Sequence, residues 1–139
     1  MRRTRTREAP CVTIETKARA YRWTIAAVLA ALALFVAALS ADLYNATSPP
    51  SLGWHVVLRK AYSVIAFAVI GYLAARALHE RGRPVGALGT VATVALYSAA
   101  IELGQYLTGV REGAAYNALD IGCGALGGAL AAIPARRSR

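Results

Sequence analysis

The chain of 139 residues is long enough for a single domain. With 57% hydrophobic residues and a mean hydropathy of +0.43, it is too apolar for an ordinary soluble domain of that size. Its net charge of +9 could suggest nucleic acid as a partner, but the basic residues lie where a membrane explains them better.

Four apolar segments are each close to the roughly 20 residues that a helix needs to cross a hydrocarbon core about 30 Å thick. They run from Trp23 to near Leu43, from Ala61 to near Leu78, from Pro84 to near Leu107 and from Asn117 to Pro134. We therefore predict an all-α protein, an integral membrane bundle of four transmembrane helices. Its membrane domain covers residues 23–134, between basic cytoplasmic tails at 1–22 and 135–139.

The basic residues are concentrated on alternate connections between these segments. Thirteen of the sixteen Lys and Arg residues lie in the two tails or between the second and third segments, and the other three are Arg59, Lys60 and Arg111. This is the positive-inside pattern for an even number of crossings with both termini in the cytoplasm. The basic tails are expected to contact anionic lipid head groups. Nucleic acid is not an expected partner, because neither interleaved aromatic residues nor a helix-turn-helix motif accompanies the charges.

The N-terminal residues 1–22 are polar and basic, and we expect them to be disordered or bound to the membrane surface. The first apolar segment is longer than the apolar region of a typical signal peptide, so it is predicted to remain as an anchor. Pro49, Pro50 and Gly53 then end any helix, and Trp54 is placed for the membrane interface.

The second apolar segment carries Lys60, Ser63, Phe67 and Gly71 at intervals of three or four residues, so these residues share one helical face. Two interpretations of this face are open. Its small residues, Gly71 among them, can pack against a neighbouring helix while Lys60 extends outward to water. Alternatively, Lys60 and Ser63 belong to a functional polar site.

The third segment has Ser98, Glu102 and Gln105 at the same spacing, which makes one helical face polar near its outer end. A carboxylate among Leu, Ala and Ile must leave water, and that is costly unless partners are supplied. The third segment therefore directs the search for a site to this end of the bundle.

The fourth segment is rich in glycine, and Gly124 and Gly128 form a GxxxG arrangement that predicts close helix packing. Asn117 and Asp120 lie within the first turn or so of the predicted helix. We expect Asn117 to act as the N-terminal cap, whereas Asp120 lies one turn deeper than a cap should.

The predicted topology brings these polar residues to one level near the outer surface: Lys60, Glu102, Gln105, Arg111, Asn117 and Asp120. Glu102 is expected about 7 Å below the end of its helix. An ionisable residue inside a membrane indicates a functional site, because its burial is costly. The alternative is that Glu102 and Arg111 form a salt bridge that only fixes the turn between two crossings.

The same residues resemble the signature of the VanZ-like family of small bacterial membrane proteins. The C-terminal part of that signature is matched by Glu102, Gln105, Arg111, Asn117, Gly124, Ala125 and Gly128. The family's D-K-x-x-H region and the positions after it are matched by Lys60, Phe67 and Gly71. Differences from the usual pattern are Arg59 in place of an acid, Ser63 in place of His, Phe67 in place of Tyr and Asn117 in place of Asp.

The resemblance, which covers residues 59 to 130, implies a multi-pass protein of the bacterial cytoplasmic membrane with a role in the cell envelope. The naming member of the family confers low-level resistance to teicoplanin, a glycopeptide antibiotic with a lipid tail. The resemblance therefore implies a connection with glycopeptide resistance.

We expect an outer-leaflet polar pocket that engages an amphiphile, either a lipid-linked envelope intermediate or a lipid-tailed antibiotic. Lys60 and Arg111 would attract an anionic head group, and Glu102 and Gln105 would orient it. The remaining candidate ligand-binding residues are Ser63, Asn117 and Asp120.

Other functions remain open at this point. Glu102 and Asp120 could be the catalytic carboxyl pair of a hydrolase or transferase acting on such a lipid. A small proton-coupled exporter and a scaffold that uses the GxxxG face for contacts are further alternatives. Whether the protein is an enzyme and whether it forms a homo-oligomer are not decided by the sequence. No metal site or cofactor is predicted, because Cys11 and Cys123 have no metal-ligand company.

Overall fold

A computed structural model describes residues 14–40, 42–43, 46, 54–109 and 114–137. Within these residues it has four long helices: α1 Ile14–Leu39, α3 His55–Glu80, α4 Ala87–Thr108 and α5 Ala114–Arg137. All four are long and apolar enough to cross a membrane. The prediction of an all-α membrane bundle with four crossings is therefore confirmed, and the chain is a multi-pass membrane protein.

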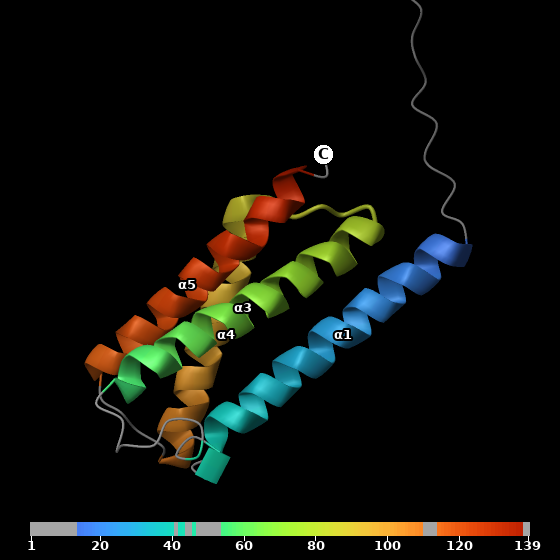
Figure 1. Ribbon diagram of the computed structural model, residues 1–139. Coiled ribbons are helices and arrows are strands. Elements are labelled where there is room, and N and C mark those ends of the chain that lie inside the picture. Colours follow the sequence, from blue (N-terminus) through green and yellow to red (C-terminus); the bar gives the residue numbers. More distant parts are fainter. Residues whose placement is uncertain (1–13, 41, 44–45, 47–53, 110–113, 138–139) are drawn as a thin grey trace, which may run out of the picture.

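The helices alternate in direction through the bundle (Figure 1). The ends of α1 and α4 and the starts of α3 and α5 lie together, and we call this side the Lys60 end. The starts of α1 and α4 and the ends of α3 and α5 form the opposite side, the Arg76 end. The start of α1 and the end of α5 therefore lie at the same side of the bundle, as an even number of crossings requires.

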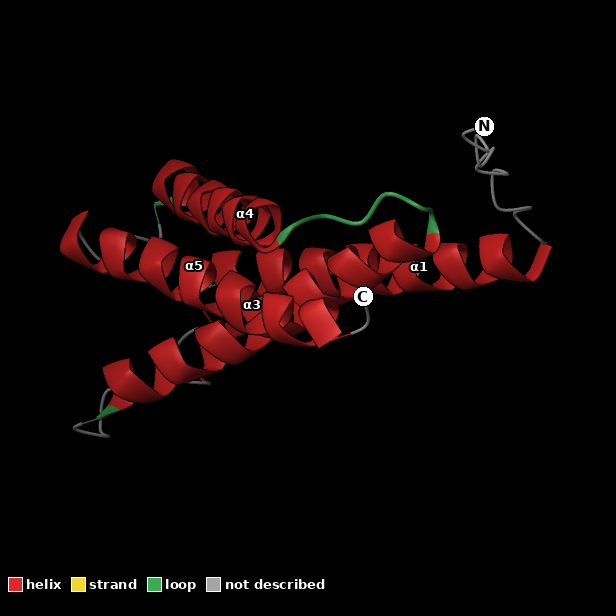
Figure 2. Ribbon diagram, turned by 90° about the horizontal axis from the view of Figure 1, so that it is seen from above, coloured by secondary structure: helices red, strands yellow, loops and turns green. Residues whose placement is uncertain are grey.

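The packing of the four helices is uneven. α5 packs along both α3 and α4, and α1 packs along α3 with a smaller contact to α4. α3 and α4 also make only a small contact with each other, since α4 crosses behind α3 at an angle (Figure 1). Figure 2 shows the same helices from above, with no strand in the described part of the chain.

The connection between α3 and α4 shows how the sequence ends a helix. Gly82 adopts a φ of 70°, a left-handed conformation that glycine reaches without steric cost. Its backbone N–H donates to the carbonyl oxygen of His79 at 2.9 Å, and that of Arg83 donates to Leu78 at 3.0 Å. These bonds satisfy carbonyls that the end of α3 would otherwise leave unpaired.

Three helices begin earlier than the sequence predicted. α1 begins at Ile14 rather than Trp23, α3 at His55 rather than Ala61, and α5 at Ala114 rather than Asn117. Residues 14–22 are therefore part of a helix, so disorder, one of the two expectations for 1–22, is wrong for them, while binding to the membrane surface stays a prediction. Ala, Lys and Arg there are good helix formers, so the fall in hydropathy marks the edge of the apolar layer and not the end of the helix.

The same shift changes the role of Asn117. An N-terminal cap precedes the first helical residue, but Asn117 lies three residues inside α5, which begins at Ala114. The prediction that Asn117 caps this helix is therefore wrong.

Glycines allow α5 to approach α4 closely. A Cβ atom at Gly124 would lie 2.6 Å from the Cβ of Ser98, and one at Gly128 would lie 2.8 Å from the Cα of Val91. Real Cβ atoms do not approach other atoms this closely, so both positions need glycine. The GxxxG face thus contacts α4 within the chain and is not available as the contact face of a scaffold.

The core lies between α3 and α4, where α5 covers it on one side and α1 packs against it through Leu34, Phe35 and Ala38. Phe67, Val94 and Ile101 are buried and pack together. Gly71 of α3 lies beside Val94, and a Cβ there would be 3.0 Å from its Cγ2. Gly127 of α5 lies against Phe67, since a Cβ there would be 2.6 Å from the Cβ of Phe67.

The outer surface of the bundle is apolar. On α4, the side chains of Leu88, Leu96 and Leu103 are 82%, 72% and 59% exposed, and their spacing places them on one helical face. α1 is the most exposed helix, with only 6% of its apolar window buried. Large exposed apolar side chains of this kind are expected where a helix faces lipid.

Candidate functional site

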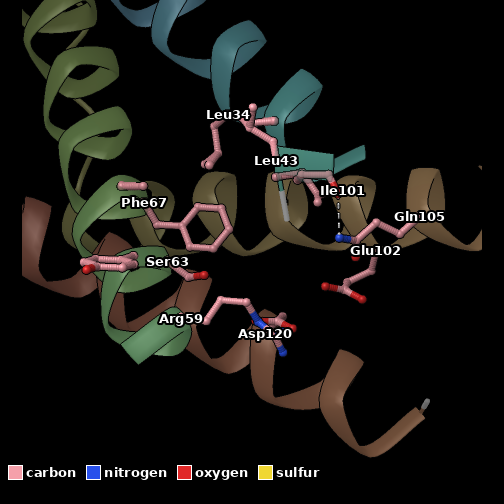
Figure 3. A pocket seen from close by; sticks show the side chains of 13 residues that line it. Leu34, Leu43, Arg59, Ser63, Phe67, Ile101, Glu102, Gln105 and Asp120 are labelled. Carbon is pink, nitrogen blue, oxygen red and sulfur yellow. Dashed lines mark hydrogen bonds between the residues drawn. The ribbon is translucent and has the colours of Figure 1, made fainter. Parts of the chain in front are cut away.

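A cavity of about 330 Å³ lies between the four helices near the Lys60 end (Figure 3). This volume is at the lower limit for small-molecule sites. Its walls are formed by Leu34, Ala37, Ala38, Leu43, Arg59, Tyr62, Ser63, Ala66, Phe67, Ile101, Glu102, Gln105 and Asp120. We call this cavity the polar pocket, because Glu102, Gln105 and Asp120, which the sequence singled out, line it together with Arg59.

The polar pocket changes in character along the helices. Arg59 and Ser63 line it near the start of α3, and Phe67 lines it further along the same helix. Phe67 is eight residues beyond Arg59, which corresponds to about 12 Å along a helix. The pocket is therefore polar toward the Lys60 end and apolar toward the middle of the bundle.

An ion pair joins α3 to α5 beside the polar pocket. The Nζ atom of Lys60 donates to Oδ2 of Asp120 at 2.5 Å, and the two side chains are only 14% and 19% exposed. Lys60 therefore does not extend outward to water, which corrects one of the two interpretations of its helical face. Asp120 acts in a tertiary contact and not as a helix cap.

Glu102 is the most buried ionisable residue of the site, with 9% exposure. The charged groups nearest in effect to it are Asp120, Lys60 and Arg59. Figure 3 shows Arg59, Glu102 and Asp120 pointing toward the same region from three different helices. We call Arg59, Lys60, Glu102 and Asp120 the charge cluster.

Gln105 lies one turn beyond Glu102 and forms a hydrogen bond to the end of α1. Its Nε2 donates to the carbonyl oxygen of Ala38 at 3.0 Å (Figure 3). Because α1 ends at Leu39, the Ala38 carbonyl belongs to the last turn, where carbonyls lack a partner within the helix. Gln105 thus caps the end of α1 from a neighbouring helix while it lines the pocket.

Two other side chains of α4 make similar contacts. The hydroxyl of Ser98 donates to the carbonyl oxygen of Asp120 at 2.9 Å. The hydroxyl of Tyr97 donates to the carbonyl oxygen of Ala31 at 2.5 Å, and its ring packs edge to face against Phe67. One face of α4 therefore holds α5, and the neighbouring face holds α1.

The structure brings together most of the residues expected at the site. Ser63, Glu102, Gln105 and Asp120 line the pocket, and Lys60 reaches it through Asp120. Asn117 lies three residues before Asp120 on α5 and is not part of the pocket wall. Arg111 lies outside the described residues, so its expected salt bridge with Glu102 stays a prediction.

The sequence analysis did not assign Arg59 and Tyr62 to the site, and it did not find the part contributed by α1. Arg59, Tyr62, Ser63 and Ala66 follow one another at intervals that place them on one face of α3, so the face could have been found by extending the polar stripe back from Ser63. Nothing in α1 marks its contribution, because its wall residues are Leu and Ala, as on its lipid-facing side.

The donor set of the site does not indicate a metal. Within the residues that the structure describes, no three His, Cys, Asp or Glu side chains are grouped so that they could hold a metal ion. Two carboxyl groups beside two cations are instead suited to charged groups of a ligand or to proton transfer.

Comparisons of the chain with protein-family models, with curated proteins and with solved structures gave no match.

Proposed function

We propose that the protein is a VanZ-like protein of the bacterial cytoplasmic membrane whose polar pocket binds the charged end of an amphiphile. The observation that carries this proposal is the polar pocket itself. Its charge cluster lies at the Lys60 end, and its deeper part is lined by Phe67, Ile101 and Leu34. A molecule with a charged group next to an apolar chain matches that order.

The side that the pocket faces follows from the charges at the two ends of the bundle. Lys17, Arg19, Arg22, Arg76 and Arg81 are all carried by the Arg76 end of α1 or α3. The positive-inside pattern assigns that end to the cytoplasm. We therefore infer that both termini are cytoplasmic and that the Lys60 end faces the outer leaflet.

The size of the pocket limits what part of a ligand enters it. Its 330 Å³ corresponds to about eleven water molecules at about 30 Å³ each. A head group with the first part of a chain fits such a volume, but a whole glycopeptide does not. The ligand is thus a lipid-linked envelope intermediate or a lipid-tailed antibiotic, and in either case only its charged group and the first part of its chain enter the pocket.

Drug susceptibility of a sensitive bacterial host tests this function. Cells that express the protein should tolerate teicoplanin better than cells with an empty vector, while their susceptibility to vancomycin, which lacks the lipid tail, should be unchanged. The Glu102→Ala variant should lose the protection at matched membrane level, because Glu102 lies at the centre of the charge cluster. Equal protection by the variant would show that Glu102 is not required for the function. Protection against both drugs would contradict recognition of the lipid tail.

A second candidate function is a hydrolase or transferase acting on a lipid-linked intermediate. It is favoured by one observation, the presence of two carboxyl groups, those of Glu102 and Asp120, in the wall of the same pocket, because neighbouring carboxyl groups can divide the roles of acid and base. Release of a labelled head group by the purified protein would distinguish turnover from binding. A proton-coupled exporter is less well supported, since the pocket lies toward one end of the bundle and transporters bind near the midplane.

A further inference from the structure

α1 is the wall of the polar pocket that packs least against the rest of the bundle. Leu34 and Ala38 of α1 face the cavity, whereas Leu32 and Val36 on the same stretch are 56% and 67% exposed on the outside of the bundle. A single helix therefore separates the cavity from the surrounding lipid at this level. α3, α4 and α5 form the rest of the wall and pack closely through Gly124.

Two hydrogen bonds fasten α1 to α4. Tyr97 donates to the carbonyl oxygen of Ala31, and Gln105 donates to that of Ala38. The two acceptors are seven residues apart, about 10 Å along the helix, so the bonds hold the stretch of α1 that covers the pocket. Apolar side chains of α1, Phe35 among them, also pack against α4 at Gly104, but the contact between α1 and α4 is smaller than that between α1 and α3.

At the Arg76 end, α1 is held by a different set of contacts to α3. Trp23 packs edge to face against Tyr72 with ring centroids 6.2 Å apart, and the guanidinium of Arg76 lies 5.6 Å from the centre of the Trp23 ring. In addition, Arg81 donates to the hydroxyl of Thr24 at 3.0 Å. These contacts do not involve α4, so they can persist when α1 leaves α4.

We propose that α1 is a lateral gate of the polar pocket. It pivots on its contacts with α3 at the Arg76 end, and its other half separates from α4 when the Tyr97 and Gln105 bonds break. The opening would admit an amphiphile sideways from the outer leaflet, with its charged group entering toward the charge cluster. That an amphiphile is what enters rests on the proposed function. The movement of α1 itself depends only on the fold.

The bonds from Tyr97 and Gln105 are suited to a gate because they are individually weak. A hydrogen bond between membrane helices shifts an equilibrium by about threefold to tenfold. A helix held to α4 by two such bonds and a small apolar contact, and facing lipid on its other side, can separate from α4 in a minor population of molecules. A ligand that fills the space between α1 and α4 would raise that population.

Distances between spin labels in lipid nanodiscs test the gate. In a variant with Cys11→Ser and Cys123→Ala, labels at Val36→Cys on α1 and Leu103→Cys on α4 report the separation of the two helices. Both sites are well exposed, at 67% and 59%. The wild-type background should show one main distance, and Tyr97→Phe should raise the share of a longer distance by about threefold or more. The substitution removes only a hydroxyl group.

Two controls separate gating from general loosening. Ser98→Ala removes a comparable bond from α4, but to α5, so it should leave the α1 to α4 distances unchanged. A second label pair, Ile65→Cys on α3 and Leu103→Cys on α4, should not respond to Tyr97→Phe. A response of both pairs, or of neither, would overturn the gate. Should Tyr97→Phe fail to fold, Gln105→Met removes the second bond and takes its place.

The outcomes also separate the gate from the proposed function. If α1 opens in Tyr97→Phe but teicoplanin does not change the distances in the wild-type background, the gate stands and the assigned ligand is wrong. If teicoplanin binds while the α1 to α4 distance remains single in all variants, the pocket function stands and the gate is refuted.

Discussion

The Lys60 to Asp120 ion pair shows how the site also holds the bundle together. Both side chains are largely buried and lie 2.5 Å apart, so each removes the cost of burying the other. Glu102 adds a second carboxyl group to the same cluster. The cluster thus combines a tertiary contact with groups that can bind a ligand, and substitutions must separate these two effects.

At this scale we predict that Lys60→Ala is strongly destabilising. It leaves Asp120 buried without its partner, and breaking a buried pair costs about 3–5 kcal/mol. The free energy of unfolding in detergent, measured by denaturant titration, should fall by an amount of this order. The reference for simple loss of a positive charge is Lys17→Ala, since Lys17 is exposed on α1 and its removal should change stability little.

A double-mutant cycle gives the sharper result. The double variant Lys60→Met, Asp120→Asn should be more stable than Lys60→Met alone, because neither partner is left as an unpaired charge. Its free energy of unfolding should also exceed the value obtained by adding the effects of the two single substitutions. If the effects of the two substitutions simply add, the ion pair does not contribute to stability, and its assignment as the link between α3 and α5 is wrong.

At the scale of the helices, glycines of α5 decide how α3 and α4 are placed. Gly127 faces α3, while Gly124 and Gly128 face α4. α5 therefore touches both partners at backbone distance, and these contacts fix the rotation that directs Asp120 into the pocket. The sequence predicted close packing from Gly124 and Gly128, but it did not identify which helix they contact or the role of Gly127.

Two glycines of α5 provide a matched test of this packing. A Cβ at Gly127 would lie 2.6 Å from the Cβ of Phe67 and 2.9 Å from the backbone nitrogen of Ala68, whereas one at Gly122 meets nothing within 4 Å. Gly127→Ala should therefore destabilise the protein by about 1–3 kcal/mol through overpacking, and Gly122→Ala should not. Thermal unfolding of the two variants in the same detergent measures the difference. Equal melting temperatures would contradict the close approach of α5 to α3.

Helix boundaries were the weaker part of the prediction from sequence. The apolar segments located all four crossings, because a helix in lipid must be apolar over its whole width. They did not locate the starts of α1, α3 and α5, because a helix can continue into water where the residues remain polar but favour helix. Trp23 thus marks the start of the apolar segment, although the helix begins at Ile14.

At the scale of the whole molecule, the predicted topology placed part of the site at the correct depth but did not predict the contacts between its side chains. Counting crossings placed Lys60, Glu102, Gln105 and Asp120 at one level. The pairing of Lys60 with Asp120, the use of Gln105 to cap α1 and the entry of Arg59 into the pocket depend on how each helix is rotated. That rotation is set by side-chain packing between helices, which hydropathy does not encode.

The central proposal is that the polar pocket binds the charged group of an amphiphile together with the first part of its apolar chain. The measurement that tests it most directly is photo-crosslinking of teicoplanin to the purified protein in nanodiscs, with Tyr62 replaced by benzoylphenylalanine. Tyr62 lines the pocket and its side chain is 52% exposed. The matched control carries the same replacement at Leu88, an 82% exposed position at the Arg76 end.

The account predicts that teicoplanin crosslinks at Tyr62 well above the level at Leu88, that excess unlabelled teicoplanin competes, and that vancomycin does not. Adding Glu102→Ala should reduce the crosslink at Tyr62 and leave that at Leu88 unchanged. Equal crosslinking at the two positions would mean that the drug only partitions into the lipid around the bundle, and it would contradict a binding site in the polar pocket.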